Sequence, residues 1–185
     1  MKRLRSVVFT PRLPALGLSS LLAAAVLSAS AFAAPTKLGT LPVTLEPGTK
    51  LFVLSDAGIQ KAFPSGNRPD AVFVSKDSKL SLSFEWRTTK LAASDLNTML
   101  TQFPAVIRAQ VPGIKSLKQQ TVTLNGDQWA DFVFVAPGKS GDVRRELLIT
   151  SAQGRMLVLT ISSTLADYGK NEADVQALTS SLKIN

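Results

Sequence analysis

Two neighbouring segments, 143–151 and 155–163, constrain the fold most, because each is apolar on both faces of a strand. Successive side chains of a strand point to opposite faces. In the first segment Leu147 and Ile149 would face one side and Leu148 the other, and the second segment has the same character. An antiparallel sheet wetted on one face would alternate between apolar and polar residues instead. This part of the sheet must therefore be covered on both sides.

Further strands are expected at 49–54, 71–75, 80–87, 117–124 and 128–136. The segment 80–87 alternates strictly between apolar and polar residues, which is typical of a half-buried strand. Asn125-Gly126 separates two of the segments, and this dipeptide favours a two-residue hairpin turn because both residues accept positive φ. A second hairpin turn is expected at 152–154, and the loops at 55–70 and 137–142 carry glycine or proline. The strands are thus expected to pair as antiparallel hairpins.

Two segments change to a helical period. Residues 94–111 and 167–182 place apolar side chains on one stripe, so each predicts an amphipathic helix. Ser94 is the expected N-cap of the first helix, and Pro104 should kink that helix or break it in two. Together the elements predict an α+β fold, in which helices cover both faces of an antiparallel sheet of about six to seven strands.

The first 33 residues have the pattern of a cleavable signal peptide. Four basic residues and no acid precede an apolar stretch at 13–27, and Ala31-Phe32-Ala33 fits the small-residue cleavage rule. The stretch is shorter than the ~20 apolar residues of a membrane-spanning helix. We expect export by the general secretory route, cleavage after Ala33, and a periplasmic protein without a stable membrane anchor. An extended lead-in at 34–48 and a single domain at 49–185 would follow.

Composition excludes several kinds of chemistry. The chain has no cysteine and no histidine, so disulfides, thiolate ligands, cysteine nucleophiles and histidine bases are all absent. Without the leader, seventeen basic and thirteen acidic residues give a net charge of +4. Apart from Arg144-Arg145, the basic residues of the mature part are spread singly, whereas nucleic-acid binding favours a basic stripe. We therefore expect no catalytic, cofactor or metal site and no nucleic-acid partner.

Several motifs have both a functional and a structural interpretation. Gly138-Lys139-Ser140 lacks the upstream glycine of a phosphate loop, because Val133 occupies that position. Ser180-x-x-Lys183 matches a Ser/Lys motif but lies at the end of the last helix. Asp167, Glu172 and Asp174 could hold Ca²⁺, although charge complementary to a helix start is the preferred interpretation. Asp131 is a candidate perturbed acid within a strand, and Trp86 and Trp129 are expected in the core.

The segment Pro64-Ser65-Gly66-Asn67-Arg68-Pro69 predicts a rigid, exposed loop that could engage a partner. The candidate partner-binding residues are Pro64, Asn67, Arg68, Lys139 and Arg144.

Residues 50–184 resemble the superfamily that joins PsbP of photosystem II, the yeast Ran-binding Mog protein and the bacterial envelope protein DcrB. The resemblance lies in Leu124-Asn125-Gly126 with the strand after it, in the paired strands 143–151 and 155–163, and in the ending Leu178–Ile184. It implies an α/β/α sandwich used for binding. Members of the superfamily act as assembly factors or adaptors, so enzymatic activity is not expected.

The resulting hypothesis is a non-enzymatic binding or accessory domain that contacts another protein of the cell envelope. One alternative is an immunity or inhibitor protein directed against a periplasmic toxin or hydrolase. Another is a hydrolase, which would require a cleft where Asp131 or Ser140 meets a lysine or arginine.

Overall fold

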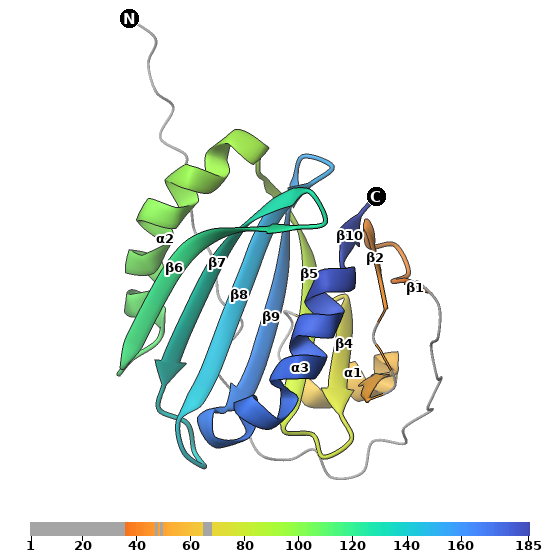
Figure 1. Cartoon of the computed structure of the whole chain (residues 1–185), viewed down its shortest axis with the longest axis vertical. Helices are drawn as coiled ribbons and strands as arrows, with labels where there is room; N and C mark the ends of the chain where they lie inside the picture. The colour runs from red at the N-terminus through yellow and green to blue at the C-terminus, as the bar shows by residue number, and fades with distance from the viewer. Residues whose placement is uncertain (1–35, 47, 49, 65–67) are drawn as a thin grey trace, which may run out of the picture.

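A seven-stranded antiparallel sheet forms the centre of the computed structural model, which describes residues 36–46, 48, 50–64 and 68–185 (Figure 1). In spatial order its strands are β3 (Leu51–Val53), β4 (Ala71–Ser75), β5 (Leu80–Lys90), β9 (Arg155–Thr164), β8 (Val143–Ala152), β7 (Asp127–Ala136) and β6 (Ser116–Leu124). The predicted leader and its cleavage site lie outside the described residues. The predicted α+β architecture is confirmed.

The hairpin turns follow the sequence pattern. Asn125 and Gly126 have φ values of 48° and 91°, and Gln153 and Gly154 have 52° and 73°. Positive φ at both central residues matches the right-handed twist of the flanking strands. The first turn sets the register of β6 against β7, and the second sets that of β8 against β9.

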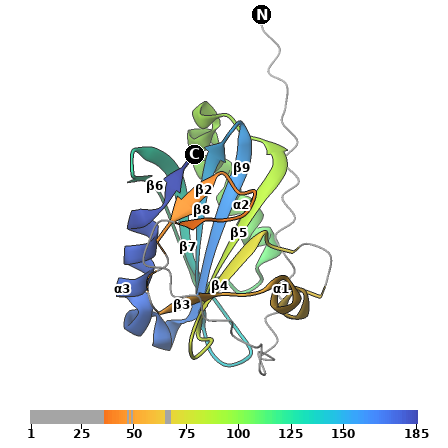
Figure 2. The same ribbon diagram turned by 90° about the vertical axis from the view of Figure 1, so that its right-hand side faces the viewer.

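Both faces of the sheet are covered. The helix α2 (Leu96–Gln110) packs on one face against Phe132, Ile149 and Val158, and the short helix α1 (Asp56–Ala62) packs against β4 on the same side. The other face carries α3 (Leu165–Ser181) and a small sheet (Figures 1 and 2). Here Leu148 and Leu159 join the second core cluster. Apolar residues on both faces of β8 and β9 therefore serve two separate cores.

Two short strands of a small sheet lie within 34–48, the segment expected to be an extended lead-in. The small sheet consists of β1 (Thr36–Lys37), β2 (Val43–Leu45) and β10 (Lys183–Ile184), in the order β1-β2-β10. Val43 and Leu45 have no solvent exposure at all. Burial of these side chains, together with pairing to the end of the chain, holds the segment in place.

Two expectations were wrong, and a third is wrong in part. The predicted loop at 55–70 contains α1, which Ser55 caps by accepting a hydrogen bond from the Gly58 N–H (3.2 Å). Ser94 does not cap α2, because it lies in a 3₁₀ turn at Ala93–Asp95 and the helix begins at Leu96. Of the two effects expected of Pro104, a break is wrong, because α2 continues to Gln110, and a kink stays a prediction. Within the described part of the chain, no helix has the length and apolar character to span a membrane.

Candidate functional site

A pocket of about 610 Å³ lies where residues 137–141 connect β7 to β8. We call it the loop pocket. The end of α2 at Val111 and Pro112 forms one wall, and the turn between β4 and β5 forms another. The rest of its lining is Ser78, Lys79, Ser81, Ala136, Pro137, Gly138, Lys139, Ser140, Gly141, Val143, Arg145, Ser162, Ser163 and Thr164. Three cationic side chains thus lie around one cavity.

Two glycines set the shape of the loop. The Gly138 N–H donates to the Gly141 carbonyl (3.0 Å), which closes the turn. A Cβ at Gly138 would lie 2.6 Å from Cγ2 of Val143 and 2.7 Å from the Gly141 oxygen, so no larger residue fits without a shift. Gly141 has a φ of 114°, a conformation that side chains disfavour. The loop therefore has one tightly defined form beside the cavity.

Arg145 is the least compensated charge in the pocket. It projects from β8 on the face that carries α2, and Ser162 of β9 is its cross-strand partner. Burial lowers the pKa of its guanidinium from the usual value, although an arginine remains charged at neutral pH. Among the described residues, no hydrogen-bond acceptor and no carboxylate pairs with this side chain.

Unlike Arg145, other charged groups at or near the pocket form ion pairs. Lys79 Nζ lies 3.2 Å from an oxygen of Asp167, so part of its charge is offset. Asp142, which follows the loop, pairs with Lys115 at 2.7 Å. No carboxylate lines the pocket itself within the described ranges. The cavity consequently has a positive potential, with hydroxyl groups as additional donors.

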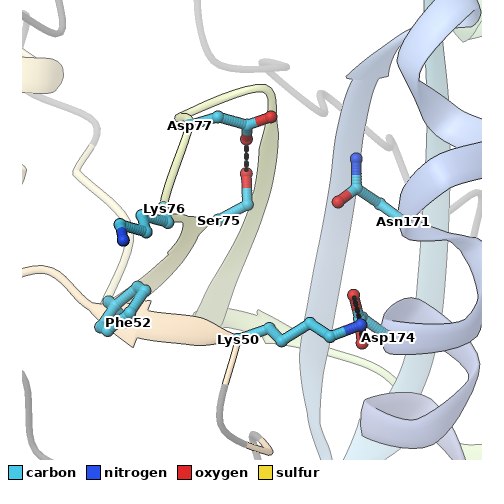
Figure 3. A pocket seen from close by; sticks show the side chains of 7 residues that line it. All are labelled: Lys50, Phe52, Ser75, Lys76, Asp77, Asn171 and Asp174. Atoms are coloured by element: carbon cyan, nitrogen blue, oxygen red, sulfur yellow. Dashed lines mark hydrogen bonds and ion pairs between the residues drawn. The ribbon is translucent and has the colours of Figure 1, made fainter.

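A second pocket differs from the loop pocket in how its charged groups are paired (Figure 3). It also measures about 610 Å³ and lies between β3, the β4–β5 turn and α3. Here Lys50 pairs with Asp174 (3.1 Å), and Ser75 donates a hydrogen bond to Asp77 (2.6 Å). That bond lowers the pKa of Asp77. Three of its four charged groups, Lys50, Asp77 and Asp174, therefore have partners within the protein, which favours a structural interpretation.

The predicted perturbed acid, Asp131, lies on the opposite face of the sheet from the loop pocket. Its side chain is only 4 % exposed and accepts a hydrogen bond from Gln120 (2.8 Å). Loss of water raises its pKa to about 6, and the nearby charge of Glu146 adds to the rise. The second carboxylate oxygen has no hydrogen-bond partner. Asp131 is thus a buried acid that accepts a hydrogen bond from a glutamine, and the charge of Arg144 offsets part of the rise in its pKa.

The candidate partner-binding residues fall on separate parts of the molecule. Pro64 and Arg68 are exposed between α1 and β4, whereas Asn67 lies outside the described residues. Lys139 is exposed at the loop pocket. Arg144 points to the other face, where it pairs with Glu146 (2.8 Å) and stacks 3.7 Å above the ring of Tyr168. These residues remain predictions, and they do not form one continuous surface.

Sequence reasoning missed Arg145. The pair Arg144-Arg145 is visible in the sequence, and adjacent strand residues must point to opposite faces. Which of the two enters a cavity depends on the register of β8 and on where α2 ends, so local pattern could not decide it.

The other motifs have structural roles. Asp167 accepts hydrogen bonds from Lys170, Thr164 and Lys79, which lower its pKa to about 2. Ser180 donates to a backbone carbonyl in the last turn of α3. In the part of the chain that the structure describes, no group of three or more acidic residues is arranged to hold a metal.

No protein-family model matches the chain, and no curated protein matches it in sequence. Solved structures do share its fold. A cyanobacterial PsbP (CyanoP) from Synechocystis sp. PCC 6803 is 11 % identical, with a TM-score of 0.51, over 89 % of this chain and 99 % of that one. A protein from Bacteroides thetaiotaomicron is 10 % identical, also with a TM-score of 0.51, over 77 % of this chain and 45 % of its own.

LpqN, involved in cell envelope biogenesis of Mycobacterium tuberculosis, is 13 % identical over 62 % of this chain and 64 % of its own, but its TM-score of 0.39 is too low to support an inference. At these identities the likeness concerns the fold alone. The chain has a PsbP-like α+β fold.

Proposed function

We propose that this chain is an exported, non-enzymatic accessory protein of the bacterial cell envelope, a member of the PsbP/Mog/DcrB superfamily that works by binding another protein. The leader pattern of residues 1–33 supports export to the periplasm. The PsbP-like fold supports an accessory role. The observation that carries the proposal is the open edge of the main sheet at β6.

β6 is the last strand of the sheet, and β7 is its sole partner among the described strands (Figure 1). It is nine residues long, and most of its residues are exposed. A long edge strand presents unpaired N–H and C=O groups, which proteins normally protect with charges, prolines or bulges. β6 contains one charged residue, Lys118, and no proline. The opposite edge, β3, is only three residues long.

The hairpin identifies the groups that face outward. Leu124 and Asp127 flank the two-residue turn, so they form a hydrogen-bonded pair. Bonding to the neighbour alternates along an antiparallel strand. Gln119, Thr121 and Thr123 therefore direct their backbone groups to the free edge. An extended segment of a partner protein would pair with these groups and add an eighth strand.

Thr121→Pro tests this mode of binding. Proline removes only the outward N–H at this position, and prolines are tolerated on the open side of edge strands. The tagged mature protein, with Thr121→Ala as matched control, would be used to capture partners from the periplasm. We expect one stoichiometric partner with the wild type and with T121A, and its loss with T121P. Equal recovery by all three forms would contradict docking at β6.

Arg68→Glu in the same capture tests the predicted loop at 64–69. A loss of the partner with this variant, but not with T121P, would move the interface to that loop. Failure of every form to enrich a protein would overturn the binding role itself.

One observation supports the hydrolase alternative: Ser140 lies in the loop pocket together with Lys139 and Arg145. The hydrolase alternative requires a cleft in which Ser140 meets a lysine or an arginine, and this pocket places the three residues together. Ser140→Ala separates the two functions, because it removes a nucleophile and leaves β6 unchanged. Hydrolysis of p-nitrophenyl acetate by the wild type, abolished in S140A, would favour an enzyme over our proposal.

A further inference from the structure

We propose that the loop pocket binds a small organic anion, whose phosphate or carboxylate group contacts Arg145. This goes beyond the proposed function and uses a different part of the molecule from β6. Three features support this binding: the charge of Arg145, the donors around it, and the size and partly apolar lining of the cavity.

Arg145 carries a charge that the protein itself does not neutralise. Removing a cation from water without a partner costs free energy, so buried arginines are normally paired. The side chain of Arg145 is half-buried, and its guanidinium has no ion pair or hydrogen bond among the described residues. A bound oxyanion would supply the missing partner, because the guanidinium fork matches carboxylate and phosphate oxygens in a bidentate geometry.

Other donors converge on the same cavity. Lys139 and Ser140 line it from the loop, and Ser162 lies across the strand from Arg145. Ser163 also lines it, but as the cross-strand partner of Arg144 it directs its hydroxyl to the opposite face of the sheet. One half-buried cation without a partner and several donors therefore occur in a pocket whose described lining has no acidic residue.

The cavity is larger than a bare phosphate needs. Its volume of about 610 Å³ falls in the range of ~300–1,000 Å³ that is usual for small-molecule sites. Val111, Pro112 and Pro137 form an apolar part of its lining. A ligand with an anionic head and an apolar body would satisfy both sides. The pocket in Figure 3 has the same volume, but two carboxylates line it and Lys50 is paired with one of them, so its positive charge is offset from within.

Titration calorimetry on the mature protein tests the proposal, with phenyl phosphate and phenylacetate as anionic probes and benzyl alcohol as the neutral probe. We expect both anions to bind and benzyl alcohol not to bind. Added salt should weaken the binding. The two anionic arms distinguish a phosphate site from a carboxylate site.

Arg145→Gln should weaken the binding by about tenfold or more, because it removes a charged hydrogen bond. Arg68→Gln is the matched control, since it removes the same charge from an exposed position outside the pocket lining. T121P should bind the probes like the wild type, so failure of this inference is distinct from failure of docking at β6.

Amide chemical shifts provide a second readout that needs no variant. Titration with phenyl phosphate should move the signals of Gly138, Ser140 and Gly141 and leave those of Asn171 near the other pocket unchanged. The proposal is overturned if neither anion binds at millimolar concentration, if R145Q binds like the wild type, or if the shifts map elsewhere.

Discussion

Asp131→Asn should stabilise the protein at neutral pH, because the buried carboxylate is held in its less favourable charged form. Its pKa rises from 3.8 to about 6 in the folded state, chiefly because burial removes water from it. Asparagine has the same shape and can still accept the hydrogen bond from Gln120. The substitution therefore removes the charge and keeps the contact.

The magnitude follows from linkage. A folded-state pKa above the unfolded value means that the folded protein binds the proton more tightly. The contribution of Asp131 to the free energy of unfolding is fully present below about pH 4, and it is lost as the pH rises through about 6. The shift of about two pKa units corresponds to an upper limit of about 3 kcal/mol at neutral pH, at ~1.4 kcal/mol per unit.

Urea unfolding of the wild type and D131N, at about pH 4 and about pH 7.5, measures this difference. We expect the free energy of unfolding of D131N to exceed that of the wild type by about 1–3 kcal/mol at the higher pH, and the two values to differ little at the lower pH. Comparison of the two proteins cancels the other titrating groups, including Asp77 and Asp167, whose lowered pKa values act in the opposite direction. The reasoning would be refuted if the difference in free energy of unfolding between D131N and the wild type were the same at both pH values, or if D131N were the less stable protein at neutral pH.

Three further changes test other contacts. Asn125→Gly keeps the positive φ but loses two hydrogen bonds to carbonyls at the end of α3 (2.7 and 2.8 Å), so urea unfolding should show a loss of about 1–2 kcal/mol. Thr164→Ala removes the cap that accepts the Asp167 N–H (3.2 Å) and should cost about 1 kcal/mol; an unchanged urea midpoint would contradict this role. Gly138→Ala should force the loop away from Val143, cost about 1–3 kcal/mol and abolish binding of phenyl phosphate; retained binding would show that the loop shape is not needed.

Much of the sheet could be predicted because its signals are local. The two-sided apolar character of 143–151 and 155–163 demanded cover on both faces, and α2 and α3 supply it. Asn125-Gly126 predicted its own turn, since positive φ is a property of the residues themselves. The buried acid Asp131 was also visible as an acid within an apolar strand, although the sequence could not show that Gln120 would be its partner.

What the amino-acid sequence determined by itself was therefore the strand and helix periods, the turns and the need for two cores. Tertiary structure alone decided that β2 pairs with β10, where Val43 lies opposite Ile184 at the far end of the chain. It also decided that Arg145 rather than Arg144 lines the loop pocket. The physical reason is the same in both cases, because the contacts join segments that are distant in sequence. A strand of two or three residues is stable only through the segments that pack against it, and the same packing decides which face of a strand is buried.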